Sequence, residues 1–151
     1  MLKKNFIILI LIFISGCGYS PIYYNLTNEE FNIKIIGTTG NSEINNLIKS
    51  KLKKYEKNNN KKSFNIILKT EYKKIIVAKN SDGIASDYEL IVNANFAINN
   101  SEISKNLVIQ EKFKIKKNDN VFDERSYENS IKRNFADLIV QKLIAQLLSY
   151  K

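Results

Sequence analysis

The pattern of apolar and polar positions divides the chain into an apolar leader and a series of strand-like and helix-like segments. An unbroken apolar run covers residues 6–14. Residues 31–35 alternate between apolar and polar side chains, which predicts a half-buried strand. Residues 37–40 begin and end with glycine and are expected to terminate this strand.

Residues 41–55 have the periodicity of an amphipathic helix. Asn41 or Ser42 is a candidate N-cap, and Glu43 would lie in the first turn. Apolar side chains then recur at helical spacing over about four turns. They are Ile44, Leu47, Ile48, Leu52 and Tyr55. The Asn- and Lys-rich residues 57–62 are expected to form a loop.

Three further segments alternate clearly enough to predict strands, and turn signals separate them at residues 80–83 and 99–101. Their polar side chains occupy the alternate positions, so one face of the resulting sheet is expected to be polar. The expected inward-facing residues are Phe64, Ile66, Leu68 and Tyr72, then Tyr88, Leu90, Val92, Ala94, Phe96 and Ile98, then Leu107, Ile109, Phe113 and Ile115.

The last segment, from about Asp123 to Tyr150, contains no Gly or Pro and predicts a long helix. Beyond Leu138 it is apolar nearly all round, so this half is expected to be buried on more than one side, within the domain or against a partner. The expected stripe is Tyr127, Ile131, Phe135, Leu138 and Ile139. The element order β-α-β-β-β-α predicts an α+β two-layer sandwich, a four-stranded mixed sheet with two helices on one face.

The leader has the layout of a cleaved export signal. Lys3 and Lys4 precede the apolar run, which as a helix would reach ~14 Å, about half the ~30 Å bilayer core. The run leads into Ile14-Ser15-Gly16-Cys17, which fits a lipobox, and Cys17 is the single cysteine of the chain. We therefore predict a lipoprotein signal at residues 1–16, a lipidated tether at residues 17–28 and one domain at residues 29–151.

The composition argues against catalysis. There is no His, and if Cys17 is lipidated no thiol remains for a nucleophile or a metal. We expect neither an enzyme nor a metal site nor a cofactor. Lys and Arg number 24 against 15 Asp and Glu, but heavy use of Lys, Asn and Ile is typical of AT-rich coding. Together with the export signal, this argues against a nucleic-acid partner.

Two short motifs carry a resemblance to a known family. One is Cys17-Gly18-Tyr19-Ser20-Pro21-Ile22-Tyr23, in which Ile22 replaces the usual Leu, and the other is the turn and strand start of residues 81–90. With the element order, they make the chain resemble the LptE family of lipopolysaccharide-assembly lipoproteins. The resemblance implies an outer-membrane lipoprotein that plugs an LptD-type β-barrel and binds lipopolysaccharide. The Lys- and Asn-rich composition departs from the family.

Candidate ligand contacts lie around the turn between the second and third strands. Lys73, Lys74 and Lys79 flank the apolar run at residues 75–77, a combination that suits an amphiphile with anionic phosphates. The alternative is that these lysines only solvate a hairpin. A second lysine group lies on the fourth strand, where it would equally protect a sheet edge. It comprises Lys112, Lys114 and Lys116.

A second functional class remains open, an auxiliary lipoprotein of a lipid-transport ABC system. Such a subunit can share a small α+β shape and a lipid anchor. Its partner would be an inner-membrane transporter, whereas the LptE-like subunit would associate with an outer-membrane barrel. Gly18 after the cysteine, in place of the Asp that favours inner-membrane retention in enteric bacteria, favours the outer membrane.

The lipid anchor is tested by Cys17→Ala. We expect the variant to accumulate as an uncleaved or mislocalised precursor, because the only acceptor for the lipid has been removed. Membrane fractionation and intact-mass measurement of the purified chain check this. A variant with normal fractionation and a normal mature mass would reject the lipoprotein interpretation.

Overall fold

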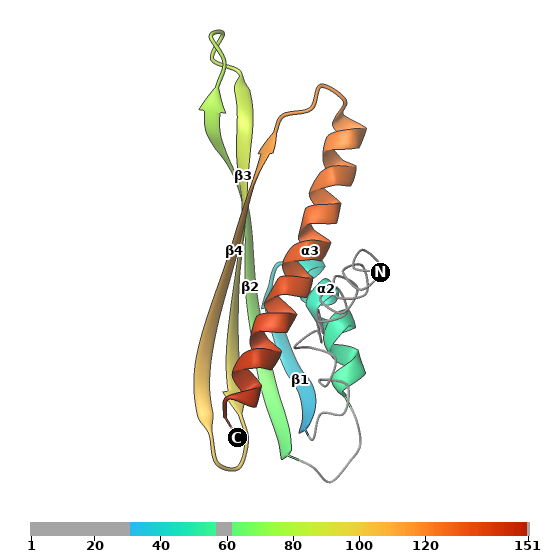
Figure 1. Ribbon diagram of the computed structural model, residues 1–151, viewed down its shortest axis with the longest axis vertical. Coiled ribbons are helices and arrows are strands. Elements are labelled where there is room, and N and C mark those ends of the chain that lie inside the picture. Colours follow the sequence, from blue (N-terminus) through green and yellow to red (C-terminus); the bar gives the residue numbers. More distant parts are fainter. Residues whose placement is uncertain (1–30, 57–61, 151) are drawn as a thin grey trace, which may run out of the picture.

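The computed structural model describes residues 31–56 and 62–150, and these form one sheet covered by two helices (Figure 1). The predicted signal at residues 1–16, Cys17, the tether at residues 17–28 and most of the predicted loop at residues 57–62 lie outside the described residues. The strands are β1 (Phe31–Gly40), β2 (Lys62–Lys79), β3 (Ala85–Asn99) and β4 (Ser104–Lys116), and the helices are α2 (Ser42–Leu52) and α3 (Val121–Leu148). The predicted fold class is confirmed.

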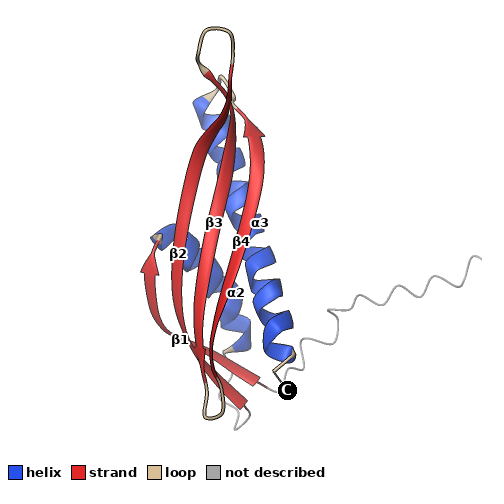
Figure 2. Ribbon diagram, turned by 90° about the vertical axis from the view of Figure 1, so that its left-hand side faces the viewer, coloured by secondary structure: helices blue, strands red, loops and turns tan. Residues whose placement is uncertain are grey.

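The sheet is mixed because its first connection differs from the other two. β1 pairs with β2 in parallel, and α2 provides the crossover that a parallel pair requires. β2, β3 and β4 follow as antiparallel hairpins, so the sheet order equals the chain order. Both helices lie on the same side of the sheet, and Figure 2 shows the other side uncovered.

β1 extends further than the sequence indicated. Instead of ending near Gly37, it continues to Gly40 and absorbs one residue in a register shift between Ile35 and Gly37. Gly40 has a φ of +89°, and a Cβ there would lie 1.9 Å from the carbonyl oxygen of Thr70. Gly40 therefore permits a close approach to β2, and neither glycine terminates the strand.

A polar junction joins α2 to the sheet. The Asn41 side chain accepts a 2.9 Å hydrogen bond from the Ile44 N–H, so Asn41 is the N-cap. Asn45, although buried, donates to the Thr39 carbonyl and accepts from the Thr70 hydroxyl at 2.8 Å. α2 then passes into a single 3₁₀ turn, η2 (Lys53–Tyr55).

The core lies between the helices and the inner face of the sheet. The predicted inward residues of β2 and β3 are buried, apart from the partly buried Tyr72 and Tyr88. On β4, Phe113 lies on the predicted face but is 44% exposed. The fully buried large side chains are Phe64, Phe96, Ile33, Ile44, Ile48, Ile66, Leu68, Leu90, Ile98, Ile139, Leu143 and Ile144.

The C-terminal half of α3 fills the wide end of this core. Its apolar residues are buried within the domain, while Lys142 and Gln146 on the opposite side are exposed. Two residues of the predicted buried stripe are not buried, because Tyr127 is 52% and Leu138 is 43% exposed. Buried residues of this half are Ile139, Val140, Leu143, Ile144 and Leu147.

Leu143→Asp tests this packing. We expect it to lower the free energy of unfolding by about 4 kcal/mol, since a packed side chain is lost and an unpaired charge is buried. Leu138→Asp on the exposed side of the same helix is the control, with an expected loss below about 1 kcal/mol. Denaturant unfolding of the full chain in detergent measures both. Equal losses would place Leu143 outside the core.

Candidate ligand-binding surface

The β2–β3 hairpin projects past the start of α3 and ends in a well-ordered turn (Figure 1). The Asn80 side chain accepts hydrogen bonds from the N–H groups of Asp82 and Ile84, at 3.1 and 2.9 Å. Gly83 completes the turn with a φ of +77°. The predicted turn is thus confirmed, and we call residues 75–85 the hairpin tip.

The hairpin tip exposes an unusual amount of apolar surface. The β2–β3 register shifts twice between Ile76 and Lys79, which interrupts the regular alternation of faces. Elsewhere, Phe122 in the first turn of α3 is 78% exposed. Exposed apolar patches on otherwise polar surfaces are typical of interaction sites. Tip residues with exposed side chains are Ile75, Ile76, Val77 and Ile84.

The three predicted ligand lysines do not form one group. Successive residues of a strand face opposite sides, so Lys73 points to the uncovered face and Lys74 toward α3. Lys73 is exposed and pairs with Glu71 at 2.8 Å. Lys79 lies exposed on the hairpin tip. Lys74 was expected to be an exposed ligand contact, and this expectation is wrong, because its side chain is only 26% exposed and pairs with two carboxylates.

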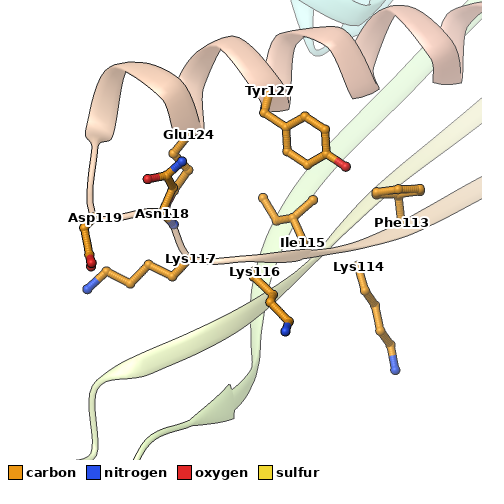
Figure 3. Close-up of a pocket in the computed structure, with 9 residues that line it drawn as sticks. All are labelled: Phe113, Lys114, Ile115, Lys116, Lys117, Asn118, Asp119, Glu124 and Tyr127. Atoms are coloured by element: carbon orange, nitrogen blue, oxygen red, sulfur yellow. Dashed lines mark hydrogen bonds between the residues drawn. The ribbon is translucent and has the colours of Figure 1, made fainter.

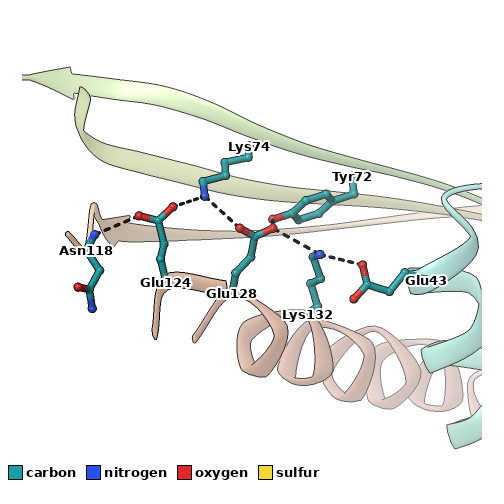
Figure 4. A network of polar contacts seen from close by, with 7 residues as sticks. All are labelled: Glu43, Tyr72, Lys74, Asn118, Glu124, Glu128 and Lys132. Carbon is teal, nitrogen blue, oxygen red and sulfur yellow. Dashed lines mark hydrogen bonds and ion pairs between the residues drawn. The ribbon is translucent and has the colours of Figure 1, made fainter. Parts of the chain in front are cut away.

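Lys74 belongs to a polar network that links β2, α2 and α3 (Figure 4). Its ammonium group lies 2.7 Å from Glu124 and 3.0 Å from Glu128. The Tyr72 hydroxyl donates to Glu128 at 2.6 Å. Lys132 reaches Glu128 at 3.4 Å.

The network continues at both ends. Lys132 pairs with Glu43 of α2 at 2.8 Å, and the Asn118 N–H donates to Glu124 at 3.0 Å. Two aromatic rings also contact its cations: the Lys74 ammonium lies 4.5 Å from the Tyr88 ring centre, and that of Lys132 lies 4.7 Å from Tyr72.

The network lowers the pKa values of Glu124 and Glu128 and so favours their ionised forms. Burial alone would raise the pKa of Glu128, but hydrogen bonds from Tyr72 and Lys74 outweigh it and the pKa is lowered. The Lys74 hydrogen bond, followed by that from the Asn118 backbone, lowers the pKa of Glu124. Burial opposes the charge of Lys74, yet its bonds to Glu124 and Glu128 raise its pKa. Burial, with the bond to Glu128, raises the pKa of Tyr72.

The network was missed in the sequence because its members look like ordinary surface charges. Glu124, Glu128 and Lys132 are spaced four residues apart, which places them on one face of a helix. That spacing was a usable signal. What it could not show was that Tyr72 and Lys74 face this stripe from β2.

The uncovered face of the sheet is largely polar. In one cross-strand row, Asn93 donates to Glu71 at 3.4 Å and accepts from Gln110 at 2.6 Å. In the next row, Lys73 and Lys112 flank Ile91. The second predicted lysine group is exposed on this face of β4. Lys73 therefore shares a face with Lys112, and Lys74 does not.

A shallow groove lies between the end of β4 and the start of α3 (Figure 3). Its volume is about 540 Å³. Phe113, Ile115 and Tyr127 face one another across it, whereas Lys114 and Lys116 point away from the helix. A second groove of about 420 Å³ adjoins it at Lys116 and Lys117, beside the hairpin tip.

Two negative observations concern the described part of the chain. Residues 31–56 and 62–150 contain no group of three or more acidic, His or Cys side chains placed to hold a metal ion. Within the same residues, neither helix is long and apolar enough to cross a membrane.

Glu128→Gln tests the network. We expect a loss of about 2 kcal/mol in the free energy of unfolding, because Lys74 and Lys132 lose a shared counter-ion at a partly buried site. Carboxylates with lowered pKa stabilise the fold above their unfolded pKa and lose this effect as the pH falls through the folded pKa. Between pH 7 and 3 the variant should therefore lose less stability than the wild type. Glu102→Gln, at an exposed turn, is the control and should keep the pH dependence of the wild type. If Glu128→Gln lost as much stability between pH 7 and 3 as the wild type does, the expectation would be contradicted.

Comparison with known proteins shows a shared fold. No protein-family model and no curated protein matches the sequence. Among solved structures, the rare lipoprotein B of Shewanella oneidensis matches with a TM-score of 0.54 and 13% identity, over 78% of this chain and 98% of that one. A minor lipoprotein of Acinetobacter baumannii matches with a TM-score of 0.51 and 10% identity, over 75% of this chain and 94% of that one. Lipoprotein B of Nitrosomonas europaea matches with a TM-score of 0.54 and 12% identity, over 80% of this chain and 84% of that one. The chain thus has a fold that these bacterial lipoproteins share.

Proposed function

We propose that this protein is an outer-membrane lipoprotein of the lipopolysaccharide assembly translocon, which sits in an LptD-type β-barrel and binds lipopolysaccharide. The observation that carries the proposal is a long sheet with one helix-free polar face, in a fold shared with solved lipoproteins. The lipobox at Cys17 supports the anchor, and the motifs at residues 17–23 and 81–90 support the family.

The polar sheet face suits a barrel interior. The lumen of a large outer-membrane barrel is hydrated and lined with polar side chains. Amide and charged side chains in cross-strand rows offer hydrogen-bonding partners to such a wall. The exposed outer-face residues include Asn65, Lys69, Glu71, Lys73, Asn95, Gln110, Lys112 and Lys114.

The hairpin tip suits an anionic amphiphile. Lys73 and Lys79 offer ammonium groups to the phosphates of lipid A, and Ile75, Ile76 and Ile84 offer apolar contact beside them. Lys74 contributes indirectly, because its ion pairs anchor β2 to α3 just below the tip.

Affinity purification of the tagged full chain from detergent-solubilised outer membrane tests the barrel partner. We expect a large outer-membrane β-barrel to co-purify. Asn95→Trp on the outer face should reduce its recovery by steric conflict, whereas Asn129→Trp on the exposed side of α3 should not. Recovery of an inner-membrane ABC transporter would instead support the auxiliary-lipoprotein alternative and reject the proposal.

Lys73→Gln combined with Lys79→Gln tests the ligand. We expect weaker binding of purified lipopolysaccharide, about tenfold at low salt, with a smaller effect at high salt because exposed charges are screened. Lys49→Gln with Lys53→Gln removes equal charge from exposed positions near α2. Equal losses in the two double variants would show binding by net charge and would contradict this site.

A further inference from the structure

The C-terminal half of β4 is an open sheet edge along which lysines alternate with apolar residues. β4 is the last strand of the sheet, and its only strand partner in the described part of the chain is β3. The Lys117 N–H donates to the Ser86 carbonyl at 2.8 Å, which extends the ladder by one bonded pair. Because bonded pairs recur every second residue, Phe113 and Ile115 also bond toward β3.

It follows that the lysines of β4 have their backbone groups at the free edge. Residues between the bonded positions direct their N–H and C=O away from β3, and these are Lys112, Lys114 and Lys116. Their exposed side chains project on the uncovered face of the sheet, as Figure 3 shows for Lys114 and Lys116. A strand added to this edge would therefore place its own outer-face side chains directly opposite three lysines.

The inner side of the same edge is partly apolar and incompletely covered, although Ile115 itself is buried. Phe113 is exposed there, and the groove of about 540 Å³ places Phe113, Ile115 and Tyr127 beside the edge (Figure 3). Lysines alone would protect this edge from pairing. The recess behind them adds a surface on which alternate side chains of a strand can pack. The added strand would place its alternate side chains in this recess.

We propose that the edge formed by residues 110–116 of β4 and by Lys117 binds an extended acidic segment of a partner protein as a fifth, antiparallel strand. The segment alternates acidic residues, which face Lys112, Lys114 and Lys116, with apolar residues, which enter the groove at Phe113, Ile115 and Tyr127. This is recognition by strand addition, in which the main chain provides affinity and the alternating side chains provide specificity. It goes beyond the proposed function, which concerns the face of the sheet and not its edge.

A second copy of this chain does not fit the same edge. Antiparallel pairing of two β4 strands centred on Lys114 would bring Lys112 opposite Lys116 and Lys114 opposite its own copy. Like charges directly opposite each other destabilise a sheet. The lysines thus disfavour this self-pairing. Asp87 and Glu89 of β3 lie opposite Lys116 and Lys114, so an acidic segment would place these two lysines between carboxylates on both sides, and Lys112, which faces Ile91, would gain its first directly opposite carboxylate.

The test uses a fluorescent peptide of roughly ten residues, in which glutamate and valine alternate, and the full chain in detergent. In the antiparallel arrangement the glutamates occupy the bonded positions, so their N–H groups donate to the carbonyls of the lysines. Methylating the glutamate nitrogens should weaken binding at least about tenfold, while methylating the valine nitrogens should change it by less than about threefold. Fluorescence polarisation measures both.

Variants of the protein separate backbone pairing from charge. Lys114→Pro removes one edge donor without breaking a bond to β3 and should abolish peptide binding, whereas Lys114→Gln should only weaken it. Lys53→Gln is the charge control and should bind as the wild type does. Equal affinity for the two methylated peptides, or no polarisation change with the unmodified peptide, would overturn the proposal even if Lys114→Pro fails to fold.

Discussion

One constraint organises this molecule: β2, β3 and β4 carry most of their apolar side chains on one face, and that face must be covered. The C-terminal half of α3 and the whole of α2 lie over it, and their largest apolar residues are fully buried there. Because both helices are used on one side, the other side stays open. The polar face that we propose to meet a barrel wall is thus the direct consequence of a one-sided core.

The means of attachment change along α3. Near Leu143 the helix is held by close apolar packing, whereas near Glu124 and Glu128 it is held by ion pairs and hydrogen bonds to Lys74 and Tyr72. The polar end leaves Phe113 and Tyr127 partly uncovered and creates the groove beside β4. The surfaces that we propose for ligand and partner binding lie at this end, where covering by apolar side chains is incomplete.

Most of the fold followed from periodicity. Alternation along β3 identified its buried face, and helical spacing identified α2 and α3, because burial of one face imposes periods of 2 and 3.6 residues on a chain. The β1 boundary was wrong, since the strand continues through Gly37 and the role of Gly40 depends on the neighbouring strand. Gly40 is required where the chain approaches the carbonyl of Thr70, a residue of β2 that local pattern cannot connect to it.

The sequence by itself determined the element order and the polarity of the two sheet faces, because these depend on residue types at local spacings, and the prediction of lipid attachment at Cys17 rests on the sequence alone. Only the tertiary structure separated Lys73 from its neighbour Lys74. One residue of offset along β2 turns the first toward the open face and the second into a cluster with Glu124 and Glu128, fifty residues or more along the chain. The partners of a charge are decided by which strands and helices meet, and this is why identical lysines in one short run have different chemistry.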